Sequence, residues 1–275
     1  MRILITGGGG QLGRDLREVL LEHEVHGFDH AGLDITDRDA VFRTVERIMP
    51  HWVINAAAFN DVDGAETAAN AAFAVNAAGA GNLAEAAAHS SAAMMHISTD
   101  YVFDGRKGSP YTESDTPNPL SVYGRTKYEG ELRVLGSGAN TMVVRTAWLY
   151  GRYGKNFVKA IRAAATRGQP LRVVADQVGS PTATLDLARA IARLITSPIR
   201  GVLHAVNAGS CSRYEFAKAI VGSAVEVIPI TSAEAQRPAP RPKNATLGSE
   251  RWLLSGIAPL RPWQDALKDF LSTIP

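Results

Sequence analysis

The sequence predicts an α/β fold in which a doubly wound parallel sheet carries a smaller C-terminal substrate-binding lobe. Two observations lead to this prediction. Apolar segments of strand length alternate with helical patterns throughout residues 1–150, an order that is typical of parallel sheets with helices on both faces. A glycine-rich turn also joins the first apolar segment to the first helical one, which is the position of the phosphate-binding turn in dinucleotide-binding folds.

The glycine-rich turn follows the apolar run Ile3–Ile5 and reads TGGGGQLG over positions 6–13. Glycine has no Cβ, so the backbone can adopt positive φ values and a phosphate can approach it closely. The helix that follows offers unpaired N–H groups and the positive end of its dipole to that phosphate. The turn therefore predicts a Rossmann-type dinucleotide site, to which we assign Gly7, Gly10, Gln11, Leu12 and Gly13.

A second strand is expected over Val25–Asp29, and it ends in a carboxylate. Dinucleotide-binding folds keep an acidic residue here to accept hydrogen bonds from the adenosine ribose. We therefore expect Asp29 to bind that ribose; the alternative is a surface aspartate in an ordinary βαβ unit. Asp34 and Ile35, in the loop that follows, are assigned to the same cofactor site.

Two helical regions come next along the chain. The first is expected over Ala40–Ile48, with Thr36 or Asp37 as its N-cap and Pro50 after its end. The second, over residues 66–93, is very rich in alanine but keeps helical periodicity. Alanine is the best helix former, so one or two packed helices are expected there.

Further strands are expected over Trp52–Ala58, Ala92–Asp100 and Met142–Thr146. Small side chains at the carboxyl end of the first of these strands let a cofactor lie against the backbone, because α/β folds bind ligands at that edge. We assign Ala57 and Ala58 to the cofactor site on this ground. Core packing is the alternative that the sequence leaves open.

The remaining chain has a long ordered loop over residues 103–119, a helix that begins near Leu120, and a mixed pattern beyond Tyr150. Helices are expected over Phe157–Ala165, Leu185–Ile195, Tyr214–Val221 and Gln264–Leu271, and strands over Leu171–Val174 and Val202–Val206. We take residues 1–150 as a dinucleotide-binding domain and 151–275 as a substrate-binding lobe. Part of that lobe, around residues 172–200, is expected to return to the first domain.

Composition excludes several classes of function. The formal net charge of +2 gives no reason to expect a nucleic acid or an anionic membrane as partner. The single cysteine, Cys211, permits no internal disulfide, and no apolar run is long enough to span a bilayer. The first strand begins at once, which leaves no room for a signal peptide. We therefore expect a soluble cytoplasmic protein.

The candidate catalytic residues lie on one predicted helix and at the end of one predicted strand. Tyr123 and Lys127 are one helical turn apart, so their side chains share a face. A free tyrosine has a pKa of about 10, and a nearby ammonium group lowers that pKa toward neutral pH. Ser98 or Thr99, at the carboxyl end of a predicted strand, can hold a carbonyl oxygen against the tyrosine hydroxyl. With a bound nicotinamide, this hydroxyl residue, Tyr123 and Lys127 can reduce a ketone; an ordinary exposed helix face is the alternative for the Tyr/Lys pair alone.

Four segments resemble the extended short-chain dehydrogenase/reductase family and, within it, the dTDP-4-dehydrorhamnose reductases. They read STDYVFDG (98–105), YGRTK (123–127), RTAWLY (145–150) and DQVGSPT (176–182), so the resemblance extends over essentially the whole chain. It implies an enzyme that uses NAD(P)H to reduce the 4-keto group of dTDP-4-dehydro-L-rhamnose, the last step of dTDP-L-rhamnose synthesis. A nucleotide sugar is then the expected substrate and a homodimer the expected assembly.

The resemblance also implies roles for individual residues. Tyr123 becomes the proton donor, Lys127 a ligand of the nicotinamide ribose, and Thr99 a residue that adjusts the proton transfer. Thr99, Asp100 and Trp148 are expected to contact the sugar, although Trp148 could instead be a buried aromatic beside the strand.

Three more residues are assigned to the substrate. Asn156 belongs to the same expected site. Arg237 and Arg241 are candidates for the substrate pyrophosphate, because a guanidinium group matches phosphate geometry. A solvated basic loop is the alternative interpretation of these two arginines.

The cofactor prediction is NAD(P)H, with NADH preferred, because the Asp29 carboxylate repels the 2′-phosphate of NADPH. Arg14, on the first helix, could still reach that phosphate. We expect no metal: the histidines show no ligand spacing. Some members of the family dimerise through a metal held by acidic residues, and Asp15 has no matching acidic set around Leu185 and Asp186.

The motifs leave further functions open. A 4,6-dehydratase of the family has Thr-Asp-Glu, whereas this chain has Thr99-Asp100-Tyr101. The chain could also be a different nucleotide-sugar 4-reductase, a 4-epimerase, which would hold NAD tightly, or a non-catalytic regulatory subunit of the same fold. The presence of Thr99, Tyr123 and Lys127 together favours an enzyme.

Overall fold

The computed structural model describes residues 1–254 and 256–274. Its centre is a six-stranded sheet with the strand order β10-β5-β4-β3-β1-β2, in which neighbouring strands run parallel. The strands are β1 (Arg2–Thr6), β2 (Glu24–Phe28), β3 (Trp52–Asn55), β4 (Ala93–Thr99), β5 (Asn140–Thr146) and β10 (Gly201–His204). The strand order reverses beside β1, and ligands of such sheets bind at this switch point.

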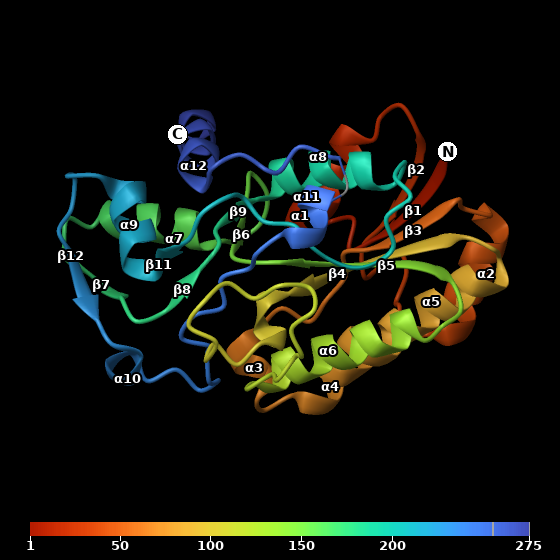
Figure 1. The fold of residues 1–275 in the computed structure, drawn as a ribbon, viewed down its shortest axis with the longest axis horizontal. Helices are drawn as coiled ribbons and strands as arrows, with labels where there is room; N and C mark the ends of the chain where they lie inside the picture. The colour runs from red at the N-terminus through yellow and green to blue at the C-terminus, as the bar shows by residue number, and fades with distance from the viewer. Residues whose placement is uncertain (255, 275) are drawn as a thin grey trace.

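Helices cover both faces of the sheet (Figure 1), as predicted. On one face lie α1 (Gln11–Val19) and α8 (Thr184–Leu194); on the other lie α2 (Arg38–Ile48), α5 (Ala80–His89) and α6 (Val122–Leu135). Successive side chains of a strand point to opposite faces. In β1, Ile3 and Ile5 join the core under α1 and α8, while Leu4 joins the core under α2 and α5.

The alanine-rich region forms one continuous helical segment made of α4 (Ala69–Phe73), a π-helical turn η1 (Ala74–Gly79) and α5. The wide turn lies where α6 approaches most closely: a Cβ on Gly130 would be 2.2 Å from the carbonyl oxygen of Asn76. A short helix α3 (Val62–Ala65) precedes it. Residues 66–93 thus form packed helices, as expected, with an irregular turn that composition did not indicate.

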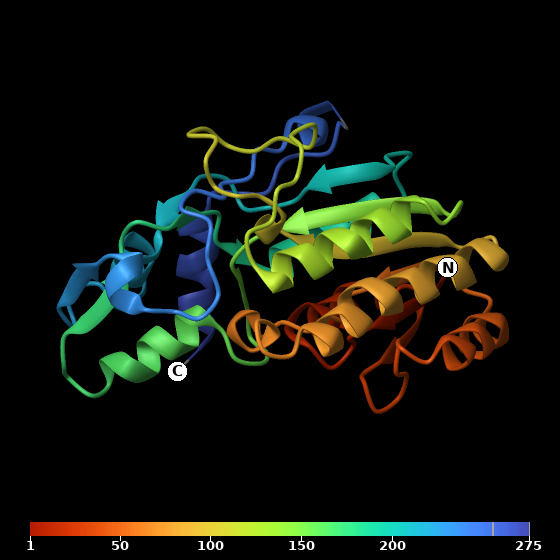
Figure 2. The ribbon, with the colours of Figure 1, turned by 90° about the horizontal axis from the view of Figure 1, so that it is seen from below.

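The C-terminal lobe packs three helices, α7 (Phe157–Ala165), α9 (Arg213–Val221) and α12 (Trp263–Thr273), around Phe216. Figure 2 shows this lobe at one end of the sheet. Three two-stranded sheets join it: β6 (Leu149–Tyr150) with β9 (Thr182–Ala183), β8 (Val178–Gly179) with β11 (Cys211–Ser212), and β7 (Leu171–Val174) with β12 (Val227–Ile230). Short helices α10 (Ser232–Ala235) and α11 (Glu250–Leu254) and the 3₁₀ turn η2 (Asp100–Val102) complete the described elements.

Part of the C-terminal half returns to the central sheet. α8 packs on α1, and β10 pairs with β5. β7, in contrast, pairs with β12 in the smaller lobe. The returning part therefore includes α8, β10 and α11, whose Trp252 lies in the same core, while the division of the chain at residue 150 stays a prediction.

Some element ends differ from those expected. β3 stops at Asn55 rather than at residue 58, although the Ala56 N–H still donates to the Thr6 carbonyl oxygen on β1. α6 begins at Val122 because the Ser121 side chain accepts a hydrogen bond from the Gly124 N–H and so caps the helix. Within the described residues, no helix combines the length and apolar character needed to cross a membrane.

Candidate active site

The glycine turn has the geometry expected of a phosphate-binding turn. Gly7 has a φ of +71°, and a Cβ there would lie 2.6 Å from the main chain of Ala56 and Ala57 on β3's continuation. A Cβ on Gly13 would lie 2.2 Å from the Gly7 carbonyl oxygen. Gly10 is the N-cap of α1 and supplies no side-chain cap, so the first-turn N–H groups remain available to an anion. The residues present therefore fit the diphosphate of a dinucleotide.

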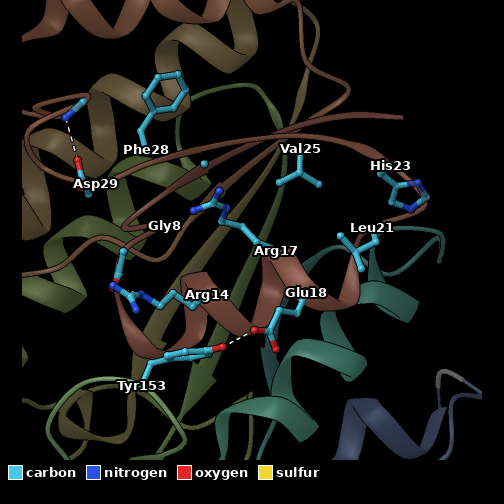
Figure 3. Close-up of a pocket in the computed structure, with 13 residues that line it drawn as sticks. Gly8, Arg14, Arg17, Glu18, Leu21, His23, Val25, Phe28, Asp29 and Tyr153 are labelled. Carbon is cyan, nitrogen blue, oxygen red and sulfur yellow. Dashed lines mark hydrogen bonds between the residues drawn. The ribbon is translucent and has the colours of Figure 1, made fainter.

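Beside the glycine turn lies a cavity of about 710 Å³ between α1 and β2, shown in Figure 3. Asp29 lines it, with its Oδ1 accepting a hydrogen bond of 2.9 Å from the Gly32 N–H. Arg14 lines it too: its Nε donates to the Gly9 carbonyl oxygen at 3.0 Å, and its guanidinium lies over the Tyr153 ring. The structure thus brings the carboxylate and the arginine considered for cofactor choice to one cavity.

The other residues assigned to the cofactor differ in how they can reach it. Leu12 and Ile35 are buried in the cores on the two faces of the sheet, so they can contact a cofactor only through their main chain. The N–H of Ala57 already donates to Asn55 Oδ1 at 3.0 Å, while Ala58 is half-buried. Asp34 accepts hydrogen bonds from Thr36. Their roles toward a cofactor stay predictions.

Thr99, Tyr123 and Lys127 come together where β4 ends and α6 begins. Tyr123 and Lys127 are buried on α6, and the Thr99 side chain lies close enough to the Tyr123 hydroxyl to lower its pKa. Thr99 Oγ1 also donates to Asp100 Oδ1 at 3.0 Å. Two hydroxyl groups, a carboxyl group and an amine thus converge: Thr99 ends β4, Asp100 begins η2, and Tyr123 and Lys127 lie at least 23 residues further along the chain on α6.

The protonation of Tyr123 differs from the expectation. Burial raises the pKa of its hydroxyl above the usual value, opposed by the hydrogen bond to Thr99 and reinforced by the charge of Asp100. The Lys127 amine is directed to the Ile97 carbonyl oxygen at 2.7 Å, and burial lowers its pKa to about 8. In this structure, desolvation therefore outweighs the lowering of the tyrosine pKa that a nearby ammonium was expected to cause.

Asp100 is a second perturbed group at this point. Burial raises the pKa of its carboxyl to about 6, opposed by the Thr99 hydrogen bond and the positive charge of Arg213. Its Oδ2 has no hydrogen-bond partner among the residues that the structure describes. A buried carboxyl with one free oxygen is available to a polar group of a ligand.

Trp148 lines a second cavity, of about 800 Å³, together with Tyr101 and Asn156. Trp148 has a φ of +46°, a left-handed conformation that is strained for a bulky residue. Gly179 leaves room for its ring, since a Cβ there would lie 2.5 Å from the indole. The Arg213 guanidinium lies 3.5 Å from the ring centroid on a face of Trp148. Trp148 is therefore half-buried but aimed into a cavity, as a contact with the substrate requires.

The two loop arginines are not equivalent. Arg241 donates two hydrogen bonds of 2.9 Å to the Asp63 carboxylate, and its side chain is 17% exposed. Arg237 lies 3.8 Å from the same carboxylate and is 65% exposed. Both line the second cavity, but Arg241 is already paired, so Arg237 is the freer cation.

Asn156 also has structural partners. Its Oδ1 accepts from the Lys159 N–H and caps α7, while its Nδ2 donates to Gln11 Oε1 at 3.0 Å and to the Gly151 carbonyl oxygen at 2.9 Å. The side chain therefore links the glycine turn to the substrate cavity, and its role as a substrate ligand stays a prediction.

Sequence reasoning missed several residues of this site. Arg213, Arg172 and Lys155 line the substrate cavity and add positive charge to it. Arg213 follows Ser212 at the start of a helix, and only its structural position beside Trp148 distinguishes it from other arginines. His96 and Asn55 were also missed. The His96 side chain contacts Lys127, and Asn55 contacts His96, but neither residue belongs to a motif.

No group of three or more histidine, cysteine, aspartate or glutamate side chains is placed to hold a metal ion in the described parts of the chain. The expectation of a site without metal remains a prediction.

Comparisons with known proteins agree with this geometry. The chain is 44% identical over 282 residues to the dTDP-4-dehydrorhamnose reductase of Mycolicibacterium smegmatis, covering 99% of this chain and 86% of the relative. It is 44% identical over 277 residues to the probable dTDP-4,6-dihydroxy-2-methyloxan-3-one 4-ketoreductase of Streptomyces antibioticus, covering 98% and 94%. A crystal structure of dTDP-4-dehydrorhamnose reductase from Bacillus anthracis in complex with NADP has a TM-score of 0.96 and 40% identity, covering 99% of both chains.

The family model described as the RmlD substrate binding domain matches residues 1–274. Together with the identities above, this match shows the family over nearly the whole length. The chain belongs to the RmlD substrate binding domain family.

Proposed function

We propose that this chain is an NAD(P)H-dependent reductase that converts the 4-keto group of dTDP-4-dehydro-L-rhamnose to the alcohol of dTDP-L-rhamnose. The observation that carries this proposal is the meeting of Tyr123, Thr99 and Lys127 beside a cavity lined by cationic side chains. The names of the relatives support a dTDP sugar with a keto group at C4.

The site residues can perform the proton transfer. A nicotinamide cofactor bound at the glycine turn supplies the hydride. A tyrosine is protonated at neutral pH, and burial raises the pKa of Tyr123 further, so the proton stays on the hydroxyl until negative charge develops on the carbonyl oxygen. Thr99, whose side chain acts on the Tyr123 hydroxyl, holds the carbonyl oxygen in line. Tyr123 and Lys127 are buried, which limits the access of bulk water to them.

The second cavity suits the nucleotide diphosphate. Arg213, Arg237 and Arg172 line it, and guanidinium groups bind phosphate oxygens in pairs. The Trp148 ring closes the cavity on the side of Arg213. A sugar held between Trp148 and Tyr101 would lie next to Tyr123, because the Tyr101 and Tyr123 rings are in edge contact at 5.5 Å.

The test is oxidation of NADH and of NADPH in the presence of dTDP-4-dehydro-L-rhamnose, followed by the absorbance of the reduced nicotinamide, with identification of the product. Tyr123→Phe should lower kcat by about 10²–10⁴-fold, the usual contribution of a general acid, while leaving cofactor affinity nearly unchanged. A Tyr123→Phe protein with full reductase activity would refute the assignment of the proton donor.

A second candidate is reduction of a different dTDP-4-keto sugar, because one relative at 44% identity carries a different sugar in its name. Comparing kcat/KM for dTDP-4-dehydro-L-rhamnose and dTDP-4-keto-6-deoxy-D-glucose separates the two. NAD that remains bound through purification would instead indicate an epimerase, and cofactor binding without any ketone reduction would indicate a regulatory subunit.

We also propose that NADH is preferred, because Asp29 lines the adenosine-side cavity next to the glycine turn. Arg14 lines the same cavity and would act in the opposite direction, by binding the 2′-phosphate of NADPH. The ratio of kcat/KM for the two cofactors, in the native protein and in Asp29→Ala, measures the balance: removal of the carboxylate should favour NADPH.

A further inference from the structure

A buried chain of hydrogen bonds leads from the sheet to the Lys127 amine. His96 Nε2 lies 3.3 Å from Lys127 Nζ, and His96 Nδ1 lies 3.1 Å from Asn55 Nδ2. Asn55 Oδ1 in turn accepts from Thr6 Oγ1 at 2.8 Å and from the Ala57 N–H at 3.0 Å. Thr6, Asn55, His96 and Lys127 come from β1, β3, β4 and α6, and all four are buried.

The orientation of the Asn55 amide follows from its partners. A main-chain N–H can only donate, so the atom of Asn55 that faces the Ala57 N–H must be the oxygen. The NH₂ group of Asn55 must then face His96 Nδ1. An NH₂ group is a donor, so Nδ1 has to be the unprotonated, accepting nitrogen of the imidazole.

This arrangement fixes the tautomer of His96. A neutral imidazole with a bare Nδ1 carries its hydrogen on Nε2, the nitrogen that faces Lys127. An ammonium group has no lone pair to accept that hydrogen, whereas a neutral amine has one. The amine can therefore donate to the Ile97 carbonyl oxygen and accept from His96 Nε2–H at the same time.

We infer that His96, held in its Nε2–H tautomer by Asn55, is a positioning residue that stabilises the neutral amine of Lys127 and so sets the pH at which this lysine releases its proton. Burial and the charge of Lys127 hold the pKa of His96 well below its usual range, so the imidazole stays neutral. Burial alone lowers the pKa of Lys127 to about 8, and the hydrogen bond from His96 acts in the same direction.

Other charged groups around α6 act on the same amine. On α6, Glu131 opposes the effect of burial and raises the pKa of Lys127, but its carboxylate is engaged with Arg145 of β5. On η2, the Asp100 and Tyr101 groups act on Tyr123. Asn76 of η1 bonds to Thr126 and carries no charge. Among the described residues, His96 is the titratable group in direct contact with Lys127 Nζ.

The consequence for catalysis rests on the proposed function. After Tyr123 has given its proton to the ketone oxygen, the phenolate must regain one before the next turnover. Lys127 as ammonium can give that proton, leaving an amine that His96 Nε2–H stabilises and that solvent reprotonates. Stabilising the amine makes the loss of this proton easier, and it also makes kcat fall as pH rises through the pKa of Lys127.

The experiment titrates Lys127 directly in the protein without substrate. Lysine labelled with carbon-13 at Cε gives an NMR signal whose shift follows deprotonation, and Lys127→Met identifies the signal by its loss. The native protein should titrate near pH 8. In His96→Gln the side-chain oxygen can turn to the lysine and accept from the ammonium, so the midpoint should rise by about one pH unit or more.

A second variant acts without touching Lys127 or His96. In Asn55→Asp the carboxylate can still accept from Thr6 and Ala57, and it accepts from His96 as well. The hydrogen then moves to Nδ1, Nε2 becomes an acceptor for the ammonium, and the Lys127 midpoint should rise too. His89→Gln, at an exposed histidine on α5, is the control and should leave the midpoint unchanged.

The pH profile of kcat provides the second readout, in which the decline at high pH should move upward in His96→Gln by the same amount as the NMR midpoint. A Lys127 midpoint in folded His96→Gln or Asn55→Asp that equals the native one would overturn the inference. A native Lys127 that remains ammonium beyond about pH 10, the range of an ordinary lysine, would do the same. Because the titration needs no substrate, it stands or fails independently of which ketone the enzyme reduces.

Discussion

The buried pair of Glu131 and Arg145 gives the sharpest prediction about stability. Arg145 donates from Nε at 2.9 Å and from Nη2 at 2.6 Å to the two oxygens of Glu131. The side chains are 0% and 3% exposed, with Glu131 on α6 and Arg145 on β5. In Glu131→Gln, one oxygen is replaced by an NH₂ group that faces a donor, and the guanidinium is left buried without a countercharge.

Removing one partner of a buried ion pair costs about 3–5 kcal/mol. A chain of this size loses about 2–4 °C of melting temperature per kcal/mol, so Glu131→Gln should melt roughly 6–20 °C below the native protein. The measurement is thermal unfolding followed by circular dichroism. Glu129→Gln, at an exposed position two residues earlier on the same helix, should change the melting temperature by about 1–2 °C at most.

The double variant Glu131→Leu/Arg145→Met tests the cause. If the cost comes from the uncompensated charge rather than from lost packing, replacing both partners should recover much of the stability. A Glu131→Gln protein that melts within about 2 °C of Glu129→Gln would contradict the reasoning, because the buried guanidinium would then be tolerated without its partner.

Two further predictions concern the site. Gly13→Ala places a methyl group 2.2 Å from the Gly7 carbonyl oxygen, so the turn must shift, and the Kd for NADH and NADPH, measured by fluorescence titration, should rise at least about tenfold. The control Gly248→Ala, where the nearest atom to the added Cβ is 3.5 Å away, should bind both cofactors as the native protein does. An unchanged Kd in Gly13→Ala would count against the turn as the phosphate site. Asp100 has a folded pKa raised to about 6, so its contribution to stability is fully present below its unfolded pKa and is lost as pH rises through 6. In urea titrations, Asp100→Asn should therefore lose less stability than the native protein between about pH 4 and pH 7, and parallel pH profiles would refute this.

Much of the fold could be predicted because its signals are local. The apolar strands, the glycine turn and the 3.6-residue periodicity of the helices all lie within short windows of sequence. Tyr123 and Lys127 were found for the same reason, since a helix places residues four apart on one face.

The features that were missed depend on contacts between distant segments. The π-helical turn at Ala74–Gly79 forms against α6, and nothing in an alanine-rich run indicates it. The pairing of Arg241 with Asp63 joins residues 178 positions apart, so the sequence could not show that one loop arginine is already paired. The pKa of Tyr123 was predicted to fall because a neighbouring charge is visible in sequence, whereas the burial that raises it is not.

The late position of β10 in the chain has a consequence for biosynthesis. β10 pairs with β5 and completes the six-stranded sheet, and α8 covers Trp52 and Ile54 on one of its faces. A ribosome makes all the residues of the glycine turn and of the Tyr123 helix long before it makes these two elements. Until residue 204 has emerged, β5 is an open edge strand, and before α8 is made the part of the apolar sheet face beside α1 stays exposed. The central sheet therefore cannot be completed until residue 204, well inside the second lobe, has been synthesised.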